Sequence, residues 1–70
     1  MRMNREEQVK EVYHRPIDKA EKIRLLEELV LDFTNEMEAQ DQNMHPELQN
    51  DLGEGLRLAR DYLRELHTAL

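Results

Sequence analysis

The stretch that decides the fold is residues 23–37, IRLLEELVLDFTNEM. Its apolar residues recur in alternating steps of three and four, which places them on one side of an α-helix: Ile23, Leu26, Val30, Phe33 and Met37. The C-terminal segment repeats this spacing at Leu52, Leu56, Ala59, Leu63, Leu66 and Leu70. The two segments therefore predict two amphipathic helices.

The polar stretch between them, QDQNMHPELQ at residues 40–49, predicts a tight connection. Pro46 suits the first turn of a helix, where its missing N–H has no partner in any case, and the residue before a proline avoids helical geometry. Because the connection is short, the helices are expected to be antiparallel neighbours. We expect an all-α fold built on this helical hairpin, with long helices over about residues 17–40 and 46–69.

The N-terminal residues predict a short third helix over about residues 5–14. Asn4 is a suitable N-cap, and Glu6 and Glu7 complement the helix dipole. Pro16 either breaks this segment from the long helix or kinks one continuous helix. A proline inside a helix costs about 3 kcal/mol, so we expect a break near His14 to Pro16.

Length and composition predict one small domain. A chain of 70 residues is near the lower limit for a self-sufficient core, and it has no cysteine for disulfides or thiolate metal sites. No apolar run is long enough to span a membrane, and charges occupy the start of the chain, where a signal peptide would be apolar. We expect a cytoplasmic protein that does not bind membranes.

The long helix carries more apolar residues than one facing helix can cover. Leu25, Leu29 and Leu31 lie beside or beyond the main stripe. Either the N-terminal helix folds across them, giving a three-helix monomer, or a second copy does, giving a four-helix bundle. We expect the homodimer, with an interface formed by Leu25, Leu26, Leu29, Val30 and Phe33.

Both glycines of the chain lie in Gly53-Glu54-Gly55, inside the second long helix. They follow a helical segment rather than a strand and lack the further glycines or lysine of a phosphate-binding loop. Each glycine costs about 1 kcal/mol against alanine in a helix interior. We expect Gly53 and Gly55 to form a helix-packing notch, with the Phe33 ring level with Gly53.

The charge is uneven along the chain, whose formal net value is −6. Residues 25–56 contain nine acidic residues and no lysine or arginine, which argues against direct binding of nucleic acid. Much of this charge belongs to the hairpin tip, where either solvation or a basic partner protein explains it: Glu36, Glu38, Asp41 and Glu47. Three arginines of the last helix have acidic residues three or four positions away, so we expect ordinary intrahelical pairing: Arg57, Arg60 and Arg64.

No arrangement of residues predicts catalysis. Glu11 and His14 have the spacing of a helical metal-ligand pair, but the chain lacks the further core glutamates of such sites, and it contains no serine. We expect no enzyme, no metal site and no cofactor. The leading hypothesis is a homodimeric protein-interaction module, such as an adaptor, antagonist or assembly factor. The alternative is an acidic mimic of nucleic acid that blocks a DNA-binding protein.

Overall fold

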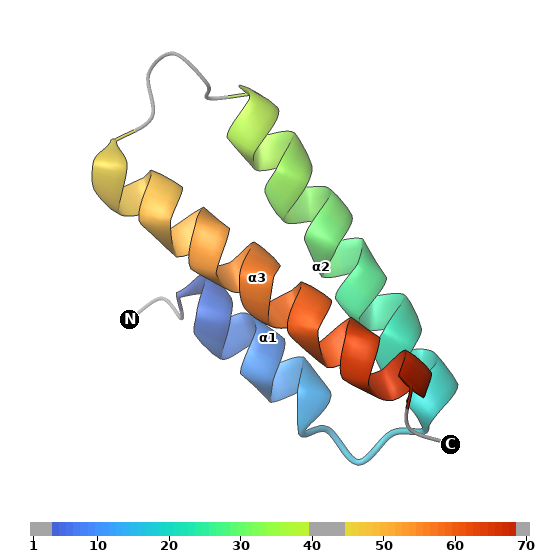
Figure 1. The fold of residues 1–70 in the computed structure, drawn as a ribbon. Coiled ribbons are helices and arrows are strands. Elements are labelled where there is room, and N and C mark those ends of the chain that lie inside the picture. Colours follow the sequence, from blue (N-terminus) through green and yellow to red (C-terminus); the bar gives the residue numbers. More distant parts are fainter. Residues whose placement is uncertain (1–3, 40–44, 69–70) are drawn as a thin grey trace.

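The computed structural model describes residues 4–39 and 45–68, which form three α-helices. In chain order these are α1 (Arg5–Tyr13), α2 (Lys19–Ala39) and α3 (Pro46–Thr68). The two long helices are antiparallel, and α1 lies alongside α3 and runs in the same direction (Figure 1). The all-α prediction, with a short N-terminal helix and two long helices packed together, is confirmed.

Side-chain caps fix where α1 and α2 begin. The Asn4 side chain accepts a hydrogen bond from the backbone N–H of Glu7 at 2.8 Å, as its position predicts. Asp18 caps α2 in the same way, accepting from the N–H of Glu21 at 2.9 Å. The sequence reasoning did not single out Asp18, although an aspartate three residues before a glutamate has the spacing of a capping box.

A proline separates α1 from α2, and another begins α3. Pro16 lies between the end of α1 at Tyr13 and the start of α2 at Lys19, so it separates two helices rather than kinking one. Its ring and missing N–H are incompatible with the interior of a continuous helix. Pro46 is the first residue of α3, the position where a proline is tolerated.

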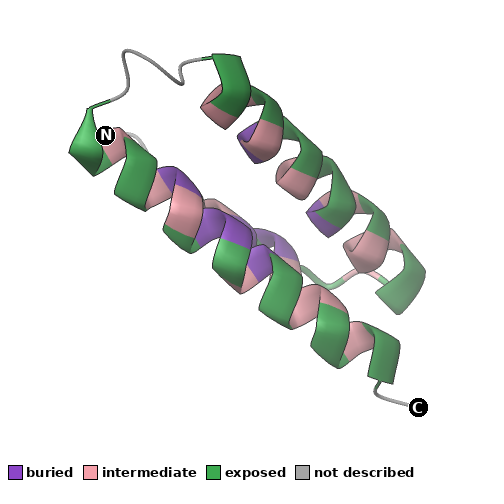
Figure 2. Ribbon diagram, turned by 45° about the horizontal axis from the view of Figure 1, so that its top comes forward, coloured by how far each residue is buried: buried purple, intermediate pink, exposed green. Residues whose placement is uncertain are grey.

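All three helices contribute to one core. Buried positions, purple in Figure 2, occur on all three helices. The buried apolar residues form one cluster: Val9, Val12, Leu26, Phe33, Leu52, Leu56 and Ala59. Two of these seven come from α1. The short helix is therefore part of the core, and the single chain packs as a three-helix unit.

The side of α2 that faces α1 is identified by two contacts. Glu36 binds Arg5 of α1, and the Lys22 ammonium lies over the Tyr13 ring. Leu29 is seven residues from each of these positions, so it lies on the same side of α2.

The residues of the predicted dimer interface pack, in part or fully, against the core of the single chain. Leu25 and Leu29 are half-buried against the core on the α1 side, and Val30 also packs on the core. Leu26 and Phe33 are 0% and 3% exposed. Two of the five predicted interface residues are thus enclosed by the chain's own helices.

Candidate interaction surface

The N-terminal end of α1 is held by an ion cluster that joins all three helices. The Arg5 guanidinium donates to Glu36 of α2 at 2.5 Å and to Asp51 of α3 at 3.1 Å. Asp51 also accepts from the Arg5 backbone N–H at 3.1 Å, which satisfies a free donor of the first helical turn. The hydrogen bond to Glu36, above all, raises the pKa of Arg5 above its usual value.

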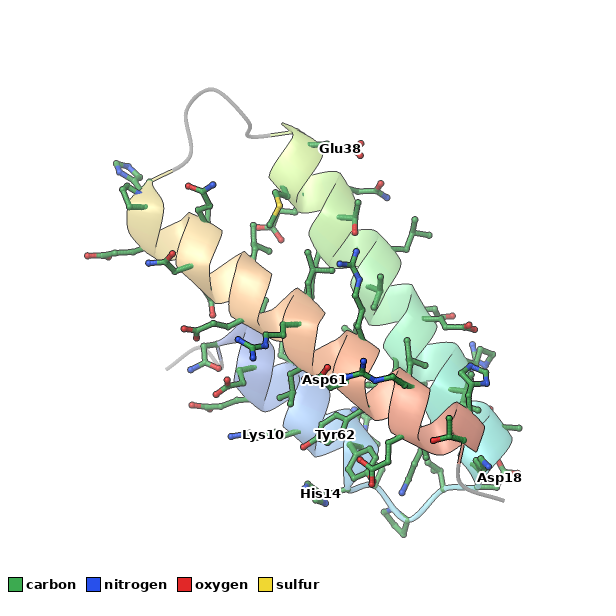
Figure 3. All side chains as sticks on the ribbon, in the orientation of Figure 1. Lys10, His14, Asp18, Glu38, Asp61 and Tyr62 are labelled. Carbon is green, nitrogen blue, oxygen red and sulfur yellow. The ribbon has the colours of Figure 1, made fainter. Side chains whose placement is uncertain are left out.

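Aromatic contacts hold the other end of α1. The Tyr13 and Tyr62 rings are stacked with centroids 3.8 Å apart, and the Tyr13 hydroxyl donates to Glu65 at 3.2 Å. Both partners belong to α3 (Figure 3 labels Tyr62). With both ends fixed, α1 covers one face of the α2–α3 pair.

The two glycines have different surroundings. Gly55 is buried, and a Cβ built there would lie 2.6 Å from the Arg5 Cβ and 3.0 Å from the Phe33 Cε2. A Cβ at Gly53 would have nothing within 4 Å. The close approach is therefore at Gly55 alone, and the expected alignment of Phe33 with Gly53 was wrong by two residues. The alignment rested on an assumed turn near residue 43 and ignored α1.

A stripe of four residues runs along α3 away from the core, with steps of four, three and four. These residues, which we call the basic stripe, are Gly53, Arg57, Arg60 and Arg64. Together with Leu56 and Asp61 they line an open groove of about 560 Å³. Figure 3 labels Asp61.

One of the three arginines of the basic stripe forms the expected intrahelical ion pair, and within residues 45–68 the other two do not. Arg64 binds Asp61 at 2.8 Å. Arg57 and Arg60, by contrast, form no ion pair with any residue of the described ranges, and the Glu65 carboxylate is used by Tyr13. Two arginines of the groove thus have free donors.

A matching stripe runs along α2, again with steps of four, three and four. We call it the acidic stripe, and its residues are Glu27, Leu31, Thr34 and Glu38. Leu31 is 60% exposed and is the one large apolar side chain so exposed in residues 4–39 and 45–68. Glu27 is exposed and has no ion-pair partner among those residues.

Both stripes lie on the face of the α2–α3 pair that points away from α1. Glu27 is nine residues from Glu36, and Arg60 is nine residues from Asp51. Nine residues at about 100° each are two and a half helical turns, so each stripe is opposite the side that binds Arg5. We call this surface the outer face.

The predicted acidic tip is not a single set of free carboxylates. Glu36 is bound to Arg5, whereas Glu38, near the end of α2, and Glu47, in the first turn of α3, are exposed (Figure 3 labels Glu38). Asp41 lies outside the described residues. Two exposed carboxylates at this end of the hairpin are therefore free for a partner.

The residues considered for metal binding are used differently. Arg15 donates to both oxygens of Glu11 at 2.9 Å, and this hydrogen bonding lowers the pKa of Glu11. In the part of the chain that the structure describes, no group of three or more His, Asp or Glu side chains is placed to hold a metal ion. Nor does that part contain a helix long and apolar enough to cross a membrane.

Comparisons of the chain with protein-family models, with curated proteins and with solved structures gave no significant match.

Proposed function

We propose that the protein is a small non-enzymatic interaction module that forms a homodimer through its outer face and meets partner proteins with the exposed carboxylates of its hairpin tip. The observation that carries this proposal is the position of Leu31. A leucine of α2 that is 60% exposed lies on the same face of the helix pair as an open groove of α3, in which Arg57 and Arg60 have no ion-pair partner among the described residues.

The chemistry of this face suits binding of a helix. An apolar side chain on one helix and a groove on its neighbour are the elements of helix-in-groove recognition. Arginine is enriched among residues that dominate binding energy, because its planar group forms several hydrogen bonds and its stem covers apolar surface. The free carboxylates of Glu38 and Glu47 are available to a partner protein with a basic surface at the same end of the module. In such a role the module is an adaptor, an antagonist or an assembly factor.

The basic stripe argues against the alternative, a mimic of nucleic acid. A mimic requires regularly spaced carboxylates along one surface, whereas three arginines occupy half of the outer face. We therefore place the interaction module first.

The proposal is tested with Leu31→Asp, because the exposed side chain of Leu31 is not needed for the core. Surface substitutions usually change the free energy of unfolding by less than about 0.5 kcal/mol, so below the dimer Kd the helical circular dichroism signal and the Tm are expected to stay near those of the wild type. Self-association, measured by sedimentation equilibrium, and capture of partner proteins from cells that make the protein are expected to be lost.

The matched control is Lys10→Gln, which makes the same change of net charge at an exposed position of α1, on the opposite side of the bundle from the outer face, where the lost ion pair with Glu6 is exposed and contributes little to stability. It is expected to retain both binding activities. The proposal that the protein is an interaction module is wrong if two results are found together. The wild type does not self-associate, and it captures no protein whose capture is lost in Leu31→Asp.

A further inference from the structure

We infer that the second copy binds on the outer face, about a two-fold axis parallel to the long helices, so that α2 of each chain lies over α3 of the other. This inference rests on the proposed function and assigns the surface and register of the homodimer. It departs from the interface expected from the sequence, because Leu26 and Phe33 are enclosed within the single chain.

The register follows from heights within one chain. Glu36 and Asp51, whose numbers add to 87, both bind the Arg5 side chain, so they stand at about the same height on the antiparallel helices. Rotation about an axis parallel to the helices keeps every height unchanged. Each residue of the acidic stripe then faces the residue of the partner's basic stripe whose number completes 87.

Two pairs follow directly from this rule. Glu27 faces Arg60 of the second copy, and neither side chain has an ion-pair partner among the described residues of its own chain. Thr34 faces Gly53 of the second copy, where the single chain leaves the space around the missing Cβ open. A glycine in a helix interior lowers helix stability. At Gly53 this cost is explained if the partner helix approaches closely there.

Leu31 completes the contact. Its height matches that of Leu56, so its side chain reaches the groove between Arg57 and Arg60 of the other chain. The methylene stems of the two arginines cover the leucine while their charged groups stay in water. In a symmetric dimer, the exposed leucine of each chain thus occupies the open groove of the other chain.

The charges select this axis over the other one. A two-fold axis in the same plane but perpendicular to the helices would place α2 on α2 and α3 on α3. The arginines of the two basic stripes would then face each other, and like charges across an interface are unfavourable. Only the parallel axis brings the acidic stripe over the basic stripe.

Charge reversal provides the test. Glu27→Arg and Arg60→Glu are made in separate chains, and self-association is measured by sedimentation equilibrium from micromolar to millimolar concentration. Each variant alone is expected to dimerise about tenfold more weakly or worse, because the axis applies every change twice and like charges then meet.

Mixing the two variants in equal amounts is expected to restore dimers of wild-type strength. In the mixed dimer the arginine introduced at position 27 faces the glutamate introduced at position 60, and the native pair forms at the other site. The matched control is Asp32→Arg, which changes the charge equally at an exposed position of α2 that lies about 140° from Glu27. It is expected to dimerise like the wild type.

Three outcomes would overturn the inference. A wild type that dimerises while the mixture stays as weak as the single variants would show that the copies meet elsewhere, leaving the homodimer itself in place. The same conclusion follows if Asp32→Arg weakens the dimer as much as Glu27→Arg. A wild type that remains monomeric at millimolar concentration would overturn the inference outright, and the module would then depend on the partner capture that Leu31→Asp abolishes.

Discussion

At the scale of single residues, Gly55 is a position where α1 and α2 both approach the backbone of α3 closely. An added Cβ would meet the Cβ of Arg5 at 2.6 Å and the Arg5 carbonyl carbon at 3.3 Å, and neither belongs to the flexible end of a side chain. The Phe33 ring, at 3.0 Å, forms the other wall. Relief of this contact would require α1 itself to move.

The two glycines are therefore expected to respond in opposite directions to alanine. Gly55→Ala overpacks the contact, which typically costs about 1–3 kcal/mol and outweighs the gain of about 1 kcal/mol in helix propensity. Gly53→Ala gains the propensity without a clash, so it stabilises the single chain by up to about 1 kcal/mol. Urea unfolding at low protein concentration measures both effects. Equal changes at the two positions would contradict the geometry at Gly55.

The sequence identified the glycine pair but could not tell its members apart. Periodicity showed that both lie inside a helix, and their helix-propensity cost implied a packing reason. Which glycine is buried depends on the Arg5 backbone, 50 residues away from Gly55 in the chain. Because Arg5 forms the tightest contact, Phe33→Leu is expected to relieve only part of the Gly55→Ala penalty.

At the scale of elements, the short helix α1 was predictable in length but not in position. Asn4 and Pro16 set its ends through local chemistry that is visible in the sequence. Its side of the bundle is set by contacts between distant residues, such as the Arg5–Glu36 ion pair and the Tyr13–Tyr62 stack. No periodic pattern encodes such contacts. The sequence alone therefore did not decide whether α1 or a second copy covers the extra apolar residues of the long helix.

The contact of α1 with α3 is expected to weaken at alkaline pH. Burial of the Tyr13 hydroxyl among its neighbours, followed by its hydrogen bond to Glu65, raises the pKa of Tyr13 above its ordinary value of about 10. A folded-state pKa above the unfolded value means that the stabilisation is complete below about pH 10. It is lost as pH rises from there through the raised pKa of Tyr13, because ionised Tyr13 would face the Glu65 carboxylate.

Comparison with Tyr13→Phe isolates this effect. The charged and titratable groups around Tyr13 are Glu65 and Tyr62 of α3, Lys22 of α2 and the neighbouring His14. All of them remain in the phenylalanine variant, so the difference in free energy of unfolding between the two proteins reports Tyr13. This difference is expected to be constant from pH 7 to about pH 9 and to fall above about pH 10. A constant difference to pH 11 would contradict the assignment.

At the scale of the whole molecule, the apolar surplus of the long helix is divided between two faces. Leu29 and Leu31 are two residues apart, which is about 200° around a helix. Leu29 therefore packs towards the core on the α1 side while Leu31 stands in solvent on the outer face. The sequence showed the apolar surplus but not which residues are covered. That depends on the position of α1, which is too short to surround the pair of long helices.

If the outer face is the homodimer surface, the stability of the protein depends on its concentration. Association of folded chains stabilises them by mass action, so each tenfold rise in concentration above the dimer Kd is expected to raise Tm by about 3–6 °C for a domain of this size. Leu31→Asp is expected to show a flat Tm equal to that of the dilute wild type, because its core is intact and its dimer contact is lost. Lys10→Gln is expected to follow the wild type. Scans monitored by circular dichroism over a hundredfold range of concentration measure all three. A flat wild-type curve would rule out a dimer that stabilises the fold, and a rising curve for Leu31→Asp would place the contact on another face.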